Sequence, residues 1–114
     1  MKQILYLDDS PERQEKFSEL YPDSTRVWNA ADCIKALKEK EWNTVSLDMD
    51  LEGIPYDDPL KDNSGAAVVR WILQNRPKVE KFIIHSYNHF LSPSMVEMLK
   101  SAGYDNTVWE PFNL

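Results

Sequence analysis

Residues 4–12 read ILYLDDSPE, and this stretch decides the fold. Four apolar residues in a row, without alternation, are typical of a strand buried on both faces, as in a parallel sheet. Ser10, Pro11 and Glu12 then supply an N-cap, a first-turn proline and a first-turn acid. The stretch predicts a buried strand that leads directly into a helix, with two aspartates at the junction.

The helix that follows is expected to run to about Leu20, with Phe17 and Leu20 on its inner face. Further short runs rich in apolar and β-branched residues predict strands at 25–28, 44–47, 81–84 and 107–109. Helices are expected between the strands, with N-caps at Asn29, Ser64 and Ser92 and a C-cap at Gly103.

Strands that alternate with helices predict crossover connections, a parallel sheet and an α/β fold. The chain has 114 residues, which is one domain's worth, and we expect residues 1–114 to form a single domain. Residues 51–63 show neither a helical nor a strand period and contain two prolines and several acids, so a loop is expected there.

Composition narrows the possible partners. The formal net charge is -6 and the pI is near 4.8, which argues against binding a long nucleic acid through a basic face. The lone Cys33 has no internal disulfide partner, and no zinc-site spacing of Cys and His is present. Without a long apolar run or a signal peptide, a cytoplasmic protein with no membrane segment is expected.

Polar side chains gather where three of the predicted strands end. These segments are Asp8-Asp9, Asp48-Met49-Asp50 and His85-Ser86-Tyr87-Asn88. Because ligands of open parallel sheets bind at the carboxyl ends of the strands, these groups are expected to converge. Each of them also has a simpler interpretation, since an Asp after a strand often caps a turn and a lone His is often structural.

Clustered carboxylates repel one another and resist ionisation unless a cation lies among them. Mg²⁺ or Mn²⁺ is the expected cation, because both are hard ions that take oxygen ligands. An ion held by carboxylates can bind a phosphoryl group, and a histidine beside it can transfer protons near neutral pH. The sequence therefore favours phosphate chemistry at this edge of the sheet.

With these segments in view, the whole chain resembles a receiver domain of two-component signalling. Asp8-Asp9 match the acidic pair of receivers, and Asp48 matches their phosphoacceptor aspartate. The resemblance implies a flavodoxin-like three-layer sandwich whose five-stranded parallel sheet has the order 2-1-3-4-5. The chain departs from receivers at Glu110-Pro111, where they have Lys-Pro.

A closer resemblance is to the cyclic-phosphate-processing receiver-like family, which is found in bacteria and their viruses. The family has an Asp-Asp pair with a downstream Arg, which Asp8-Asp9 with Arg13 resembles. Its Asp-His-Asp-Leu motif is similar to Asp48–Leu51, and its His-Ser-x-Asn motif is similar to His85–Asn88. Ala102-Gly103-Tyr104 continues the match. Met49 stands where the family has the middle His.

This resemblance implies a metal-dependent phosphoesterase that processes a cyclic phosphate or cyclic nucleotide. The implied metal ligands are Asp8, Asp9 and Asp48, the implied catalytic residues Asp48, Asp50 and His85, and the implied substrate-binding residues Arg13, Ser86 and Asn88. His85 would protonate the leaving oxygen, and the attacking group would be water activated by the ion or Asp48 itself.

Three alternatives remain open. The chain could be an atypical response-regulator receiver phosphorylated on Asp48, or a module that binds a nucleotide or a protein without chemistry. A haloacid-dehalogenase-like reaction at Asp48 and Asp50 is the third. The sequence does not fix the oligomeric state.

Overall fold

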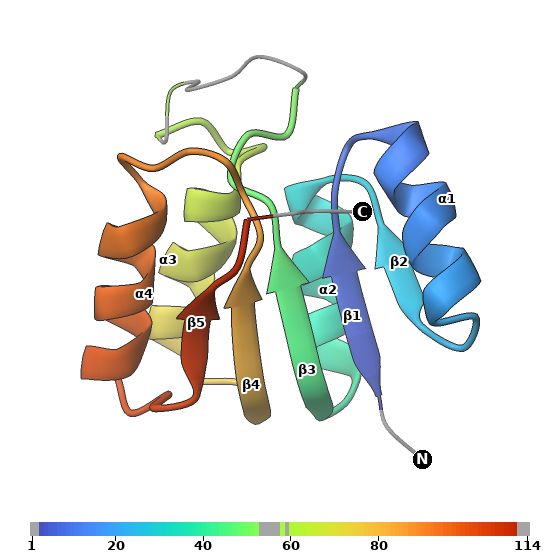
Figure 1. Cartoon of the computed structure of the whole chain (residues 1–114). Helices are drawn as coiled ribbons and strands as arrows, with labels where there is room; N and C mark the ends of the chain where they lie inside the picture. Colours follow the sequence, from blue (N-terminus) through green and yellow to red (C-terminus); the bar gives the residue numbers. More distant parts are fainter. Residues whose placement is uncertain (1–2, 53–57, 59, 112–114) are drawn as a thin grey trace.

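A computed structural model describes residues 3–52, 58 and 60–111. Within these residues, helices flank a five-stranded sheet (Figure 1). The strands are β1 (Ile4–Leu7), β2 (Thr25–Val27), β3 (Trp42–Leu47), β4 (Val79–Ile84) and β5 (Thr107–Trp109). The helices are α1 (Pro11–Leu20), α2 (Ala30–Glu39), α3 (Gly65–Asn75) and α4 (Ser92–Ser101).

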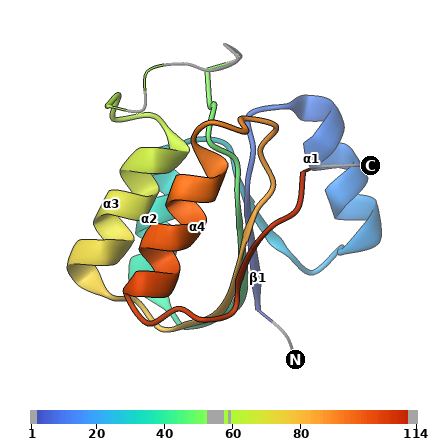
Figure 2. The ribbon, with the colours of Figure 1, turned by 60° about the vertical axis from the view of Figure 1, so that its left-hand side comes forward.

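All neighbouring strands are parallel, and their order is β2-β1-β3-β4-β5. This order and the alternation of strands with helices confirm the predicted fold class. The helices α2, α3 and α4 cover one face of the sheet, and α1 lies on the other (Figure 2). Along the described residues, no helix has the length and apolar character needed to cross a membrane.

The main core lies between the sheet and the three-helix face. Its strand members alternate along the chain, as in Leu5 and Leu7 of β1 and Phe82 and Ile84 of β4. Tyr6, which points to the opposite face, is also fully buried, so β1 is covered on both sides, as predicted. Cys33 belongs to the core and is fully buried.

Most of the predicted helix ends are present. The N-cap side chains of Ser10, Asn29 and Ser64 each accept a hydrogen bond from the backbone N–H three residues later. Gly103 follows α4 with a φ of 101°, a left-handed conformation that suits glycine.

The predicted cap at Ser92 is wrong. Ser92 is the first residue of α4, and its Oγ has no hydrogen-bond partner within the described part of the chain. The amide oxygen of Asn88 instead accepts hydrogen bonds from the backbone N–H groups of Phe90 and Leu91, just before the helix. Asn88 therefore shapes the turn before α4. The sequence had predicted that Asn88 would contact a ligand.

Two other expectations differ from the structure. Leu20 is 57 % exposed, because α1 turns only part of its surface toward the sheet and Leu20 lies outside that part. Strands β3 and β4 begin two residues earlier than predicted, at Trp42 and Val79, which are paired with each other. The predicted loop 51–63 lies partly outside the described residues, which omit 53–57 and 59.

Strand register aligns the residues that precede the site. Tyr6 pairs with Ser46, and Ser46 pairs with Ile83, so these three side chains form a row across the α1 face. Two residues further along, backbone hydrogen bonds continue past the strand ends. The N–H of Asp48 donates to the carbonyl of Leu7, and the N–H of His85 donates to the carbonyl of Leu47.

Candidate functional site

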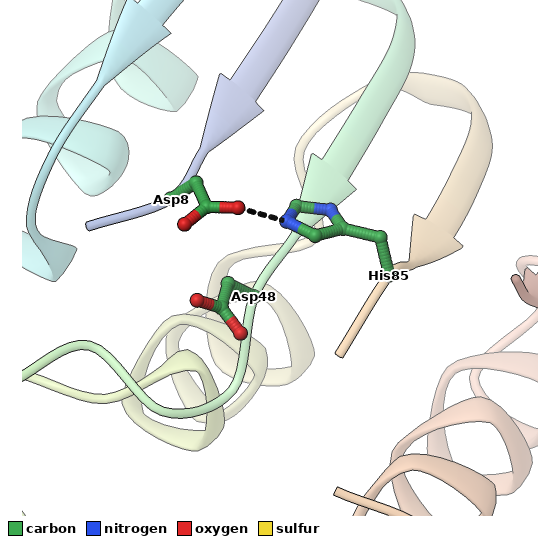
Figure 3. Close-up of side chains that lie close together, drawn as sticks. All are labelled: Asp8, Asp48 and His85. Carbon is green, nitrogen blue, oxygen red and sulfur yellow. Dashed lines mark hydrogen bonds and ion pairs between the residues drawn. The ribbon is translucent and has the colours of Figure 1, made fainter. Parts of the chain in front are cut away.

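Three ionisable side chains meet at the carboxyl edge of the sheet: Asp8 after β1, Asp48 after β3 and His85 after β4 (Figure 3). One oxygen or nitrogen of each lies within 4.8 Å of the other two. All three are buried, with exposed fractions of 0 %, 5 % and 3 %. The parallel register brings them together from positions about forty residues apart.

Asp8 accepts hydrogen bonds from five donors. Its Oδ2 accepts from the Tyr6 hydroxyl at 2.9 Å, from Arg13 Nε at 2.7 Å and from His85 Nε2 at 3.1 Å. Its Oδ1 accepts from Arg13 Nη2 at 3.0 Å and from the backbone N–H of Ser10 at 2.9 Å. A carboxylate offers about four lone-pair positions, so Asp8 has no free acceptor capacity in this arrangement.

Burial by itself would raise the pKa of Asp8. The hydrogen bonds that Asp8 accepts from His85, Arg13 and the backbone of Ser10 outweigh burial and hold its pKa well below the ordinary value. The same contact raises the pKa of Arg13. Asp8 and Arg13 therefore form a bidentate pair that is charged at neutral pH.

Asp48 is in the opposite situation. Its Oδ2 is buried and has no hydrogen-bond partner in the described residues, and Arg13 Nη2 lies 3.6 Å away. Burial, and then the negative charge of Asp8, raise the pKa of Asp48 to about 8, although Arg13 and a hydrogen bond from the backbone of Asp50 oppose this. Without a further cation, the site does not accommodate a second buried negative charge.

His85 is held from both sides of its ring. Because Asp8 is ionised and can only accept, we assign the proton to Nε2, and Nδ1 then accepts from the Ser46 hydroxyl at 2.6 Å. Burial lowers the pKa of His85 despite the nearby Asp8 charge, so the ring is neutral near pH 7. The ring also stacks on Tyr6, with centroids 4.8 Å apart.

Comparisons with known proteins show the family and the fold. Residues 3–101 match the family model of the cyclic-phosphate processing receiver domain. The chain belongs to this family. Among curated proteins, this receiver domain has no significant match.

Solved structures show the same fold. The response regulator TrrA from Thermotoga maritima, in complex with Mg²⁺-BeF, is 21% identical with a TM-score of 0.69, and the match covers 100% of this chain and 89% of that one. A CheY-like receiver domain from Methanospirillum hungatei is 18% identical with a TM-score of 0.70, covering 99% and 84%. The BeF3-activated receiver domain of DrrB, a Thermotoga maritima protein, is 25% identical with a TM-score of 0.64, covering 99% and 87%.

The other predicted site residues of the receiver domain surround the cluster. Asp9 is partly buried, and its charge contributes to the raised pKa of Asp48. Asp50 Oδ1 lies 3.4 Å from Asn88 Nδ2, and Ser86 Oγ accepts from the backbone N–H of Asn88. Among the predicted substrate-binding residues, Ser86 and Asn88 thus hold the loop, and Arg13 contacts the carboxylates directly.

Met49, the departure from the family's motif, belongs to the hydrophobic core and is 1 % exposed. Its side chain lies beside Gly65, at the start of α3. Gly65 makes this packing possible, because a Cβ there would lie against the carbonyl oxygen of Asp48 and 2.7 Å from Met49 Cα. The Met49 side chain therefore has a packing role.

Sequence analysis missed two residues that touch the cluster, Tyr6 and Ser46. Each stands two positions before an aspartate at a strand end, and alternate residues of a strand share a face. That periodicity is the signal that could have found them. Gln14 was also missed; its side-chain amide donates to the carbonyls of Asp8 and Val27 and ties β1 to β2.

Proposed function

We propose that this receiver domain binds a divalent cation beside Asp48 and hydrolyses a cyclic phosphate there. The observation that carries the proposal is the buried Oδ2 of Asp48, which lacks a hydrogen-bond donor in the described residues. A buried carboxylate oxygen that accepts no hydrogen bond is costly even with Arg13 Nη2 3.6 Å away, and a cation bound to it would lower that cost. Its raised pKa agrees with this need.

The residues fit Mg²⁺ or Mn²⁺. Oxygen ligands suit both ions, and Asp48 and Asp9 are the acids whose oxygens would hold the ion, because those of Asp8 already accept five hydrogen bonds. A bound ion would neutralise the negative charge of the phosphoryl group and polarise its phosphorus–oxygen bonds. The Mg²⁺-BeF complex of TrrA, which has the same fold, supports this choice of ion.

Arg13 is the residue that would bind the phosphate. Its side chain is 33 % exposed, and its guanidinium is fixed on Asp8 through Nε and Nη2. A guanidinium presents paired donors that match phosphate oxygens. Asp8 thus acts by orienting Arg13 at the mouth of the site.

His85 has a positioning role in this proposal. A general acid needs a proton on a nitrogen that faces the substrate, but Nε2 donates to Asp8 and Nδ1 accepts from Ser46. The neutral ring of His85 fixes the orientation of the Asp8 carboxylate, and Asp8 in turn fixes the orientation of the Arg13 guanidinium. We therefore propose that water protonates the leaving oxygen and that His85 acts through Asp8.

The substrate class rests on the family, whose description names cyclic-phosphate processing. The net charge of -6 and the single exposed guanidinium at the site favour one small phosphate over a polyanion. A cyclic nucleotide or another cyclic phosphate is the corresponding small partner.

Hydrolysis of 2′,3′-cyclic and 3′,5′-cyclic nucleotides and of cyclic dinucleotides, with Mg²⁺, Mn²⁺ or EDTA, tests the proposal. We expect turnover that EDTA and Asp48→Asn abolish and that Asp105→Asn, a change at an exposed acid, preserves. Equal turnover by Asp48→Asn would contradict the assignment. Binding of a nucleotide without turnover in any metal would favour the non-catalytic module.

A second function is supported by the position of Asp48 at the end of β3 in a receiver fold. The receiver domain of DrrB, which has this fold, takes up BeF3. Treatment with acetyl phosphate and Mg²⁺, followed by mass measurement, tests phosphorylation of Asp48. An adduct lost in Asp48→Asn would favour the signalling function, whereas its absence would favour the phosphoesterase, as does Glu110 at the position of the receiver lysine.

A further inference from the structure

The α1 face of the sheet has a second set of aligned side chains, on the amino-terminal side of the row formed by Tyr6, Ser46 and Ile83. Ile4 pairs with Thr44, and Thr44 pairs with Lys81, one row before Tyr6, Ser46 and Ile83. In the described residues α1 is the one helix on this face, and β3, β4 and β5 carry no helix over them there (Figures 1 and 2).

A cavity of about 220 Å³ lies at the boundary between α1 and these rows. Phe17 and Tyr21 form its wall on the α1 side, with centroids 4.8 Å apart, and Ile83 lines it from the sheet. Thr44, Ser46 and Lys81 are the polar residues that line it from the sheet. Apolar walls with a few convergent polar groups are typical of small-molecule sites.

We propose that this cavity binds a small planar ring that bears one carboxylate. The aromatic side chains of Phe17 and Tyr21 offer faces and edges against which a flat ring packs. Lys81 is partly buried and forms no ion pair with any described residue, so its charge can attract an anion bound in the cavity. The hydroxyl of Thr44 stands beside Lys81 in the register and can donate to the same anion.

Size limits the ligand further. An engineered cavity of roughly 150 Å³ holds benzene, and sites for drug-sized ligands begin near 300 Å³. A cavity of about 220 Å³ therefore suits one ring with a carboxylate. The proposed site is thus separate from the phosphate site in both position and ligand class.

The two sites are nevertheless in contact through one residue. Ser46 lines the cavity, and its hydroxyl donates to Nδ1 of His85. Tyr6, which stacks on Phe17 with centroids 3.9 Å apart, also donates to Asp8. A ligand that binds against Phe17 and Ser46 should therefore shift the NMR signals of the His85 ring, which gives an independent measure of binding.

Titration of the ¹⁵N-labelled full chain with benzoate, followed by two-dimensional NMR, tests the proposal. We expect saturable shifts at Thr44, Ser46 and Ile83 and at the His85 ring, with a Kd near 1 mM, typical of a ligand of about nine non-hydrogen atoms. Benzamide, which has the same shape without the charge, should bind at least about fivefold more weakly.

Variants separate the charge of Lys81 from general surface charge. Lys81→Met keeps the aliphatic stem and should weaken benzoate binding at least about fivefold, whereas Lys78→Met, at an exposed lysine before β4, should leave it unchanged. Lys81→Glu should exchange the preference from benzoate to benzylammonium, which keeps the proposal testable if Lys81→Met unfolds.

Absence of saturation below about 20 mM benzoate, or equal affinities for benzoate and benzamide, would overturn the proposal. Shifts at the same residues that depend on protein concentration alone would assign the face to a second copy of the chain and would equally overturn it. None of these measurements requires metal or turnover, so failure here and failure of the proposed phosphoesterase are distinguishable.

Discussion

Replacement of Asp48 by Asn should stabilise the metal-free protein. The pKa of Asp48 is raised to about 8 in the folded chain from an ordinary value of 3.8. Such a carboxyl binds its proton more tightly when folded, so its favourable contribution is full below about pH 4 and is lost as the pH rises to about 8. The amide of Asp48→Asn would keep the shape of the side chain without a charge to bury.

The structure sets the magnitude. Each pH unit between the ordinary pKa and the working pH corresponds to about 1.4 kcal/mol, which gives an upper bound of about 4 kcal/mol at pH 7. The new amide must find partners beside Arg13, which reduces the expected gain to about 2 kcal/mol. For a domain of this size, that gain raises Tm by roughly 8 °C.

Thermal unfolding in EDTA at pH 5, 7 and 8 measures this effect. The advantage of Asp48→Asn should grow with pH, and Asp105→Asn, at an exposed acid, should change stability by less than about 0.5 kcal/mol throughout. Saturating Mg²⁺ should raise the Tm of the wild type and not that of Asp48→Asn. An Asp48→Asn variant that melts below the wild type in EDTA at pH 8 would refute the reasoning.

Three further predictions concern stability and proton position. Asp8→Asn should lower the free energy of unfolding by about 3 kcal/mol at pH 7 in urea titrations, because it breaks a buried ion pair. The loss should shrink below pH 4, since the pKa of Asp8 is lowered in the folded state and its contribution disappears as the pH falls; an equal loss at pH 7 and pH 3 would contradict this. Gly65→Ala should cost more than about 2 kcal/mol because its Cβ meets backbone, whereas Gly103→Ala, strained only by its φ of 101°, should cost about 1 kcal/mol; similar costs would argue against the close packing at Gly65. Ser46→Ala should move the Nδ1 resonance of His85 toward that of an unbonded imidazole nitrogen in ¹⁵N NMR, and an unchanged resonance would disprove the assigned proton position.

Much of the fold was predictable from local patterns. The apolar run before Asp8 and the cap at Ser10 define a strand and a helix without any knowledge of the rest of the chain. Leu20 and Ser92 were predicted wrongly because exposure and capping depend on how a helix docks. Ser92 does not cap α4, and Asn88, which the sequence suggested for a ligand contact, instead accepts hydrogen bonds in the turn before the helix.

The candidate site was predictable in its members and less so in their roles. The alternation of strands and helices was enough to bring Asp8, Asp48 and His85 to one edge of a parallel sheet. Asp8 accepts five hydrogen bonds, whereas Oδ2 of Asp48 accepts none from the described residues, and this difference depends on where Arg13 points. That direction follows from the docking of α1. No sequence pattern encodes that direction.

Both edges of the sheet are short, and this has a consequence for association. The edge strands β2 and β5 have three residues each, whereas the inner strands β3 and β4 have six. Intermolecular strand addition needs a row of unpaired backbone donors and acceptors, and three residues offer few of them. Contacts between copies, or with a protein partner, are therefore expected to use side-chain surfaces, and the sheet itself should resist aggregation at high concentration.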